Sequence, residues 1–415
     1  MRRNWCAVLL AAAVGTGVGL SGTIGAAGRY PAAQSAADEP QDPVATLNRE
    51  IQAGRVRLPF DGSRGYLTAV LRALDVPVES QTLVFSETSF QTQYINPGNP
   101  RALYFNDTVA VGWVMGGDLL EVIAQDPRRG AMLYSLEQQE VPQPQLSRDD
   151  RCRQCHETAF TAGVPGWLTM STLPLSDDPA DHPRGWQVDH RTPIEDRWGG
   201  WFVTGPQAPR VHLGNVQVNH AERSYMRLPE APVLASVDVD RDAYLSSSSD
   251  VAALLVLNHQ THMLNLLTRL AAEARVVELD GVVGSRFSTI VRDVADYLLF
   301  VDEAPLPRPV RGSSAFAETF SARGPRDERG RSFRELDLTT RLLRYPCSYL
   351  VHSPSFDALP ALARDAVYAR IWRVLSGEDP DPRYARMPLA DRQAVGEILR
   401  ATKAGLPDYF QRPLK

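Results

Sequence analysis

Residues 102–114 read ALYFNDTVAVGWV, two short runs of apolar residues separated by the pair Asn106-Asp107. Runs of this length, rich in β-branched and aromatic residues and bounded by turn-forming residues, are typical of β-strands. Similar runs occupy residues 82–85 and 131–136, and NPGNP at 96–100 supplies a further turn signal. We therefore expect a β-rich region over residues 81–139.

The second half of the chain has a helical pattern. Asp250 is expected to cap a helix over residues 251–273, with leucines supplying much of its apolar surface. Further helices are expected at residues 291–300, 359–375 and 389–403, the last ended by Gly405 with Pro407 beyond it. Residues 305–331, rich in Pro, Gly, Ser and Arg, predict a long surface loop. The expected fold class is α+β, with a β-rich region at 47–245 and a mainly helical region at 246–415.

Residues 152–156, Cys-Arg-Gln-Cys-His, carry the strongest chemical signal. With 4 Cys and 8 His in 415 residues, a random order would give roughly 0.0007 copies of this pattern, so chance is a poor explanation. Each thiol can add to one haem vinyl group, because a single backbone turn presents both sulfurs along one porphyrin edge. One nitrogen of His156 would then coordinate the iron while the other donates to an acceptor elsewhere. The motif predicts one covalent haem c held by Cys152, Cys155 and His156.

Three other sites also use a Cys-x-x-Cys pair: a disulfide, a thioredoxin-like dithiol and half of a zinc site. A zinc site would need partners, and the other cysteines, Cys6 and Cys347, are far away in sequence. A thioredoxin-like pair would follow a hydrophobic strand of a βαβ unit, whereas QPQLSRDD at 143–150 precedes this one. Neither context is present, and a haem-free dithiol protein is kept as an alternative.

The amino terminus predicts export. Arg2 and Arg3 form a positive start, residues 5–14 are continuously apolar, and small residues follow. We expect a secretory signal peptide over residues 1–27, although cleavage after Ala37 would fit equally well.

A disordered lead is expected over residues 28–46, which are rich in Ala, Gln, Asp and Pro, with folding beginning near Leu47. Glycines from Gly15 onward shorten the apolar part of the start to about ten residues, fewer than the ~20 that cross a bilayer. We therefore expect no transmembrane anchor, and a periplasmic or otherwise exported bacterial protein.

The charge balance is mildly acidic. The formal net charge is −5, and removal of residues 1–27, which hold two Arg and no acidic residue, makes it −7. This argues against nucleic-acid binding, for which a basic stripe is expected, and would allow steering toward a basic redox partner protein. Once Cys152 and Cys155 hold haem, Cys347 alone remains in the mature chain, and one thiol makes no internal disulfide.

Residues 152–156 resemble the attachment motif of c-type cytochromes, and the resemblance implies covalent haem c, His156 as proximal ligand and electron transfer. The flanking blocks are similar to an uncharacterised group of exported bacterial proteins described as cytochrome c domain-containing. The similarity rests on residues 101–107, 112–114, 163–166, 197–205 and 212–215. Small cytochromes are compact helical domains of roughly 100 residues. Their fold is not expected in this longer, strand-rich chain.

The chemistry at the iron depends on the ligand opposite His156. A methionine raises the potential, a second histidine lowers it, and an open position admits a small ligand. Met170, 14 residues after His156, is the nearest downstream candidate for a metal ligand. The other candidates are Met226, Met263, His190, His212 and His220. Each also suits an ordinary core or surface role.

His259 and His262 share one face of the expected helix, where they could bind a metal or place an imidazole over the haem. A polar stripe on an amphipathic helix is the simpler interpretation. Trp198 and Trp201 could line the haem pocket, but ordinary burial explains them more simply. The pair Gly199-Gly200 between them marks a bulge or a close backbone approach.

Two functions from different classes follow. The favoured one is electron transfer by an exported mono-haem c-type cytochrome with an unidentified redox partner. The alternative is a peroxidase-like haem oxidoreductase, which needs an open distal site and a positioned acid or base. The sequence specifies no catalytic residue or substrate for it.

Overall fold

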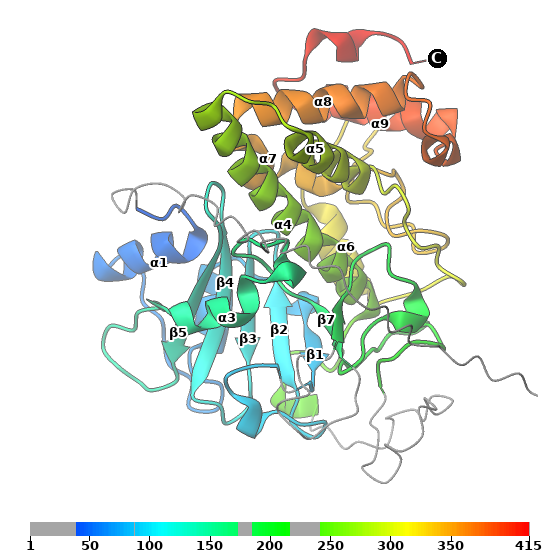
Figure 1. Ribbon diagram of the computed structural model, residues 1–415. Coiled ribbons are helices and arrows are strands. Elements are labelled where there is room, and N and C mark those ends of the chain that lie inside the picture. Colours follow the sequence, from blue (N-terminus) through cyan, green and yellow to red (C-terminus); the bar gives the residue numbers. More distant parts are fainter. Residues whose placement is uncertain (1–38, 87, 173–184, 216–240, 415) are drawn as a thin grey trace, which may run out of the picture.

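The computed structural model describes residues 39–86, 88–172, 185–215 and 241–414. The expected signal peptide and most of the expected lead, residues 1–38, lie outside them, as do His220 and Met226. Figure 1 shows a sheet on one side of the molecule and a group of helices stacked against one end of it. This is the expected α+β fold, with strands in the amino-terminal half and helices mainly in the carboxyl-terminal half.

The strands are β1 (Thr82–Val84), β2 (Arg101–Phe105), β3 (Val109–Trp113), β4 (Leu119–Asp126), β5 (Gly130–Glu137), β6 (Ser147–Arg148), β7 (Met170–Thr172) and β8 (Gly185–Gln187). The helices are α1 (Pro43–Gln52), α2 (Leu67–Ala73), α3 (Arg153–His156), α4 (Val251–Asp280), α5 (Ser285–Leu298), α6 (Ser314–Ala322), α7 (Pro354–Asp357), α8 (Ala361–Leu375) and α9 (Leu389–Thr402).

β1 to β6 form one antiparallel sheet in sequence order, and β7 pairs with β8 in a separate two-stranded sheet. The expected strands at 82–85, 102–105, 109–114 and 131–136 are confirmed within a residue or two. β4 lies in the expected β-rich region but was not singled out. Its sequence, LLEVIAQD, mixes charged and amide residues into the apolar positions of one face, which weakens the run.

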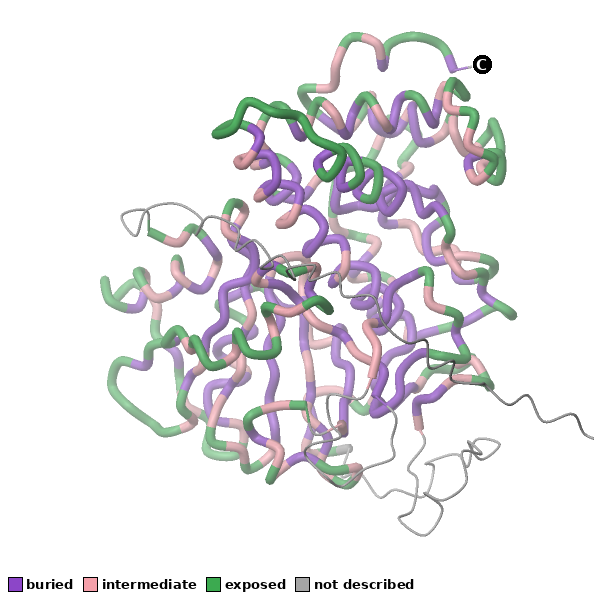
Figure 2. Tube along the Cα trace, viewed as in Figure 1, coloured by how far each residue is buried: buried purple, intermediate pink, exposed green. Residues whose placement is uncertain are grey.

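The two faces of the sheet belong to two hydrophobic cores. One face, with Tyr104, Val111 and Leu120, packs with residues of α1 and α2. The other face contributes residues such as Phe105 and Ala131 to a larger core built mainly from α4, α5, α8 and α9. Figure 2 shows the continuous buried zone where sheet and helices meet. The two halves of the chain therefore share a core.

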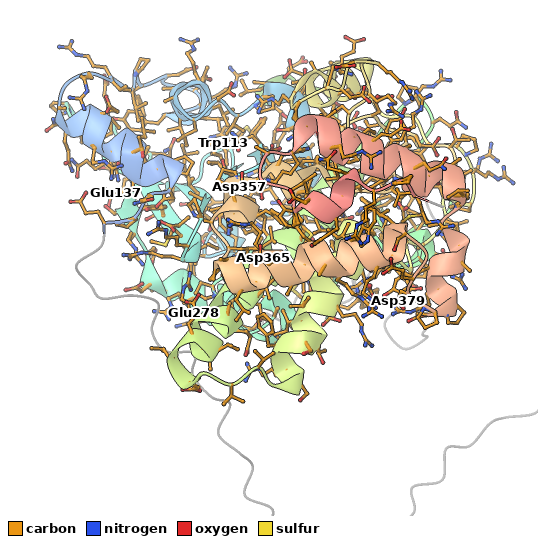
Figure 3. The ribbon with its side chains drawn as sticks, turned by 90° about the horizontal axis from the view of Figure 1, so that it is seen from above. Trp113, Glu137, Glu278, Asp357, Asp365 and Asp379 are labelled. Atoms are coloured by element: carbon orange, nitrogen blue, oxygen red, sulfur yellow. The ribbon has the colours of Figure 1, made fainter. Side chains whose placement is uncertain are left out.

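α4 is the central helix of the second half, and it confirms the expected cap: the Asp250 side chain accepts from the backbone N–H groups of Ala252 and Ala253. The helix continues past the expected end at residue 273, because the first residue suited to stop it is Gly281, which ends it with φ 70°. Seen from above, α8 crosses the helical half with Asp365 on it and Asp379 beyond its end (Figure 3).

Two local expectations are corrected. Folding begins at α1, four residues before Leu47, since the Asp42 side chain caps a helix that has Pro43 at its first position. Residues 305–331 are not one surface loop, because they contain α6, which Ser313 caps. Phe316 and Phe320 on this helix are buried in the larger core and override the loop-like composition.

Candidate haem-attachment site

The CxxCH motif forms a single helical turn on the surface of the sheet-bearing half. The side chain of Asp149 accepts from the backbone N–H of Arg151 and starts a short 3-10 turn over Asp150–Cys152, which leads directly into α3. Arg153 and Glu157 form an ion pair one turn apart that supports this short helix. Cys152, Cys155 and His156 thus project from one turn, which is the geometry that the spacing predicts.

The motif is anchored to the sheet at its amino-terminal side. β6 pairs with β5, and the backbone N–H of Asp149 donates to the carbonyl of Leu133 at 3.2 Å. In Figure 1 the turn of α3 is seen in front of the strands. The charge of Glu121 on β4 raises the pKa of both Cys152 and His156.

One row of paired residues crosses the sheet at Glu121. Leu103, Gly112, Glu121 and Ser135 are paired with one another in one row across β2 to β5. Gly112 has no side chain, and a Cβ added there would meet the Leu103 Cδ2 at 3.2 Å. The row therefore carries the side chains of Leu103, Glu121 and Ser135, and Leu103 and Arg101 cover the backbone of Gly112.

Both thiols of the motif are free, with Cys155 exposed and Cys152 half-buried. Burial raises the pKa of the Cys152 thiol to about 11, and the carboxylates of Asp149 and Glu121 act in the same direction, against Arg151. The Cys152 sulfur is therefore a protonated thiol at neutral pH. This is the opposite of the lowered thiol pKa on which dithiol oxidoreductases depend.

His156 is held by one nitrogen. Its Nδ1 lies 2.9 Å from the carbonyl oxygen of Gly166, and the backbone N–H of Gly166 donates to the His156 carbonyl at 2.8 Å. A carbonyl oxygen only accepts, so Nδ1 carries the proton and Nε2 has the lone pair. Within the described part of the chain, Nε2 takes no hydrogen bond. Burial lowers the pKa of His156, although the Gly166 carbonyl opposes this, so the ring is neutral.

The backbone of Gly166 is tightly enclosed. A Cβ at this position would lie 2.5 Å from the Asn265 Oδ1 and 2.9 Å from the Thr161 Cβ. On the other side of the same loop, the backbone N–H of Ala131 on β5 donates to the Pro165 carbonyl. Glycine at 166 allows this close approach, and the acceptor for His156 is thereby fixed in place.

An ion pair lies next to the motif. Arg101 Nη1 on β2 is 2.8 Å from Glu121 Oε2 on β4, and Ser89 Oγ donates to Glu121 Oε1 at 2.8 Å. The Arg101 Nε is buried and finds no hydrogen-bond partner among the described residues. Arg101 and Glu121 shift the pKa of His156 in opposite directions. They are the charged groups that would act on an iron bound to His156.

Two aromatic side chains near the motif are exposed. Phe90 is 45% exposed and carries the Arg151 guanidinium over its ring at 5.3 Å, and Phe160, four residues after His156, is 37% exposed. Large apolar side chains left in contact with water often mark a surface that binds an apolar partner. These two rings could cover part of a porphyrin.

Met170 begins β7 and is half-buried, and its backbone carbonyl accepts from the Trp201 Nε1 at 2.8 Å. It is the fourth residue after Gly166, so the Cα atoms of the two lie within about 14 Å of each other. Met170 is thus tethered near the loop that holds His156. No hydrogen bond or ion pair recorded in the described ranges joins it to the motif.

The other candidates for a sixth ligand that the structure describes belong to other sites. Met263 is fully buried in the core around α4. His212 packs edge-on against Trp198 at 5.6 Å, and burial lowers its pKa to about 4. Trp198 and Trp201 are core residues, as the simpler interpretation has it. The Gly199-Gly200 pair marks a close approach, because a Cβ at Gly199 would lie 2.0 Å from the Thr172 carbonyl oxygen.

His259 and His190 are buried and bind each other through their imidazole rings. Their Nδ1 atoms are 2.7 Å apart, and the His259 Nε2 is 2.7 Å from the Ser348 hydroxyl. The His259 ring is stacked with those of Tyr297 and Phe300, and burial lowers its pKa to about 3. Both nitrogens of His259 already have partners.

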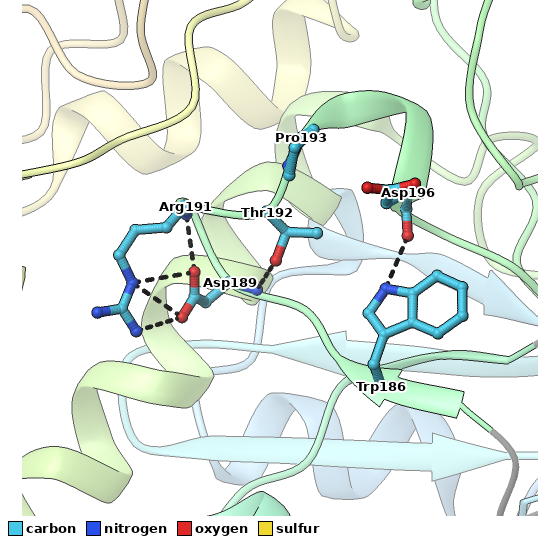
Figure 4. Close-up of a pocket in the computed structure, with 6 residues that line it drawn as sticks. All are labelled: Trp186, Asp189, Arg191, Thr192, Pro193 and Asp196. Atoms are coloured by element: carbon cyan, nitrogen blue, oxygen red, sulfur yellow. Dashed lines mark hydrogen bonds and ion pairs between the residues drawn. The ribbon is translucent and has the colours of Figure 1, made fainter. Parts of the chain in front are cut away.

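His262 faces a different environment, although it is only three residues from His259. Its Nδ1 meets Gln187 Nε2 at 2.8 Å and its Nε2 meets Arg191 Nη2 at 3.1 Å. Arg191 is paired with Asp189 at the rim of an open pocket of about 610 Å³ (Figure 4). The structure therefore does not bring His259 and His262 together on one metal.

The polar side chains of this pocket are largely satisfied by one another. The Asp189 carboxylate pairs with the Arg191 guanidinium, and the backbone N–H of Asp189 donates to the Thr192 hydroxyl (Figure 4). Trp186 Nε1 donates to the backbone carbonyl of Asp196. In the part of the chain that the structure describes, no group of three or more His, Cys, Asp or Glu could hold a metal ion. Within the same residues, none of the helices has the length and apolarity to span a membrane.

Sequence reasoning missed the residues that orient His156. Gly166 was noted only within the similarity block 163–166, and Asn265 and the Arg101–Glu121 pair were not considered. A glycine after a proline, ten residues beyond the motif, is the one local signal for a close approach there. The other contacts are made between residues 20 to 110 positions apart, which no local pattern reports.

Comparison of the chain with protein-family models, with curated proteins and with solved structures gives no match.

Proposed function

We propose that the protein is an exported mono-haem c-type cytochrome that transfers electrons through a haem c bonded to Cys152 and Cys155, with His156 as the proximal ligand. A haem bound there would supply one-electron chemistry between ferric and ferrous iron. The observation that carries the proposal is the state of His156: Nδ1 donates to the Gly166 carbonyl, and Nε2 is neutral and free of hydrogen bonds within the described residues.

This arrangement matches what a metal-ligating histidine requires. Such a histidine usually donates its second nitrogen to a carbonyl or carboxylate, which fixes the tautomer and the ring orientation. The Gly166 carbonyl does this for His156, and burial, which lowers the pKa of the ring, favours its neutral form. The imidazole is therefore prepared to bind iron at little further cost in orientation.

The thiols support haem attachment over a dithiol function. Cys152 and Cys155 are free and lie in one turn with His156. A thioredoxin-like mechanism needs a thiolate at neutral pH, whereas burial and the carboxylates of Asp149 and Glu121 raise the pKa of Cys152. The resemblance to exported cytochrome c domain-containing proteins adds the expectation of a periplasmic location.

The surroundings of the motif suggest how this chain would hold the group. Phe90 and Phe160 would give up exposed apolar area on contact with a porphyrin. The unpaired Nε of Arg101 is a donor suited to a carboxylate, such as a haem propionate. Met170, tethered to the same loop through Gly166, is our proposed sixth ligand.

The decisive experiment is mass spectrometry and visible spectroscopy of the protein made in a host that attaches haem c. We expect a mature mass equal to the polypeptide without residues 1–27, or without residues 1–37, plus one haem. We also expect a reduced-minus-oxidised spectrum of a low-spin haem that carbon monoxide does not change. A mass equal to the bare polypeptide would contradict the proposal.

The response to carbon monoxide separates the two haem functions. Ready binding of carbon monoxide to the ferrous protein would indicate an open distal site and would favour the peroxidase-like oxidoreductase. The variant Met170→Ala serves as the matched reference, because it opens that site if Met170 is the ligand. A wild type that already behaves like Met170→Ala would rule Met170 out.

A further inference from the structure

The polar face of α4 reaches the loop that orients His156. We propose that Asn265 is a positioning residue for His156, acting through the backbone of Gly166 and Trp167, so that helix α4 sets the orientation and the basicity of the iron ligand. The effect on the iron rests on the proposed function, whereas the effect on the loop does not.

Asn265 binds both backbone polar groups of Trp167, the N–H and the carbonyl. The Trp167 N–H donates to Asn265 Oδ1 at 2.7 Å, and Asn265 Nδ2 donates to the Trp167 carbonyl at 2.8 Å. Asn265 is fully buried and Trp167 is 2% exposed, so water does not compete for these bonds. A buried amide paired in this way holds a backbone segment as a neighbouring β-strand would.

The held segment includes the acceptor of His156. Residues 166 and 167 share a peptide unit, formed by the Gly166 carbonyl and the Trp167 N–H. The carbonyl oxygen of this unit accepts from His156 Nδ1, and its N–H donates to Asn265. The peptide is planar, so fixing its N–H end also fixes the direction of its carbonyl. One rigid group therefore connects Asn265 to His156.

A second set of hydrogen bonds connects α4 to this loop. The indole N–H of Trp167 donates to Gln125 Oε1 on β4 at 2.9 Å, and Gln125 Nε2 donates to Thr268 Oγ1 on α4 at 3.2 Å. Asn265 and Thr268 are three residues apart, on one face of the helix. Asn265 thus holds the backbone of Trp167 directly, and Thr268 holds its side chain through Gln125.

The peptide unit also couples the strengths of the two hydrogen bonds that it makes. An N–H that donates to Asn265 polarises the peptide and makes the Gly166 oxygen a better acceptor for His156. A stronger bond at Nδ1 makes the imidazole a more basic ligand, which stabilises ferric iron relative to ferrous iron. Loss of the Asn265 contacts is therefore expected to raise the midpoint potential of the haem.

The test compares Asn265→Ala with Asn258→Ala in the full chain carrying its haem. Asn258 lies on the same helix and is 2% exposed, and its Oδ1 accepts from Trp198 Nε1 at 2.9 Å, away from the 166–167 peptide. Both variants lose a buried amide, with two hydrogen bonds removed in Asn265→Ala and one in Asn258→Ala. We expect a higher midpoint potential and altered ferric electron paramagnetic resonance g values in Asn265→Ala, and wild-type values in Asn258→Ala.

Backbone hydrogen exchange provides the readout that does not depend on haem. In Asn265→Ala, peptides containing Gly166 and Trp167 should exchange faster than in the wild type, with or without haem, and Asn258→Ala should leave them protected. Asn265→Asp keeps the acceptor for the Trp167 N–H but sets an oxygen against the Trp167 carbonyl in a buried site, so it should also speed exchange at these residues. It serves in place of Asn265→Ala if that variant does not fold.

The outcomes separate this proposal from the previous one. Wild-type exchange at Gly166 and Trp167 in Asn265→Ala would overturn the positioning role, whether or not haem is present. Faster exchange with unchanged potential and g values would overturn the link to the iron. Faster exchange in Asn265→Ala, together with a wild type that attaches no haem, would confirm the contact with the loop and contradict the cytochrome function alone.

Discussion

The molecule holds two histidine sites that differ in what their nitrogens do. His156 lies at the surface of the sheet-bearing half with Nδ1 on a carbonyl and Nε2 without a hydrogen bond in the described residues. His259 is completely buried in the helical half, with Nδ1 on His190 and Nε2 on Ser348. The first is arranged to take a ligand, and the second is arranged to be part of a core.

This contrast shows that the second partner of an imidazole is more informative than the presence of the ring. Histidines that share a helix face could suggest a metal site at His259 and His262. The structure directs these two side chains to different partners, His190 and Gln187. A free nitrogen next to two free thiols is the feature that distinguishes His156.

The largest expected effect is the loss of covalent haem when the two thiols of the motif are removed, compared with removal of the thiol in the helical half. The double variant Cys152→Ala/Cys155→Ala should lose covalent haem completely, because no other described pair of thiols can form the two thioether bonds. Cys347→Ala is the control, since Cys347 is fully buried in the helical half. It should retain one haem by mass spectrometry and by the pyridine haemochrome spectrum. Covalent haem in the double variant would refute the assignment.

The two histidines should respond in opposite ways to truncation. His259→Ala should lower the free energy of unfolding by roughly 3–5 kcal/mol, since it removes a buried, stacked ring and two hydrogen bonds, but should leave the haem spectrum unchanged. His156→Ala should change the spectrum to that of a haem lacking its proximal ligand and should affect stability much less. Urea titration and visible spectroscopy measure the two effects. An equal loss of stability in both variants would remove the contrast.

The pH dependence of stability tests the buried site directly. Burial lowers the pKa of His259 to about 3, and the ring lies close to His190, His262 and Asp189. An unfolded chain binds a proton at this residue below about pH 6.5, whereas the folded chain does not. The stability linked to His259 is therefore complete above about pH 6.5 and is lost as the pH falls toward 3.

His259→Phe removes this titration while keeping an aromatic ring. The slope of unfolding free energy against pH, measured by urea titration between pH 6 and 4, should decrease by up to about 1.4 kcal/mol per pH unit. An unchanged slope would mean that His259 is protonated in the folded chain.

The smallest expected effect concerns the ion pair beside His156. Glu121→Gln removes a negative charge near the iron and should raise the haem midpoint potential, whereas Arg101→Gln should lower it, each by about 1 kcal/mol for such mostly buried, paired charges. Redox titration of both variants measures this. Shifts of the same sign would show that the pair acts by packing and not by charge.

The sequence predicted the elements that have strong local patterns. Strands bounded by turn residues and the helix capped by Asp250 were correctly placed, because hydrophobic periodicity and capping act over a few residues. α6 was missed since the composition of residues 305–331 is loop-like, and the packing of Phe316 and Phe320 outweighs it. The end of α4 was placed too early because Gly281 stops it later than the leucine pattern indicates.

At the candidate site, the sequence predicted the three residues of the motif and that the second nitrogen of His156 would find an acceptor. The sequence did not identify that acceptor, because the contact between Gly166 and His156 depends on the conformation of the loop that joins them. Asn265 is farther still, at a position 109 residues beyond His156. Contacts of this kind depend on how the halves pack together and leave no periodic pattern.

The shared core has a consequence for how the protein can be divided. Val84, Phe105, Ala110 and Ala131 of the sheet-bearing half pack among residues of α4 and its neighbours. A chain ended at residue 245 would expose these side chains to water on a sheet whose other face is already covered. Such a fragment is expected to aggregate, so the smallest autonomous folding unit that contains the CxxCH turn should extend through the carboxyl-terminal helices.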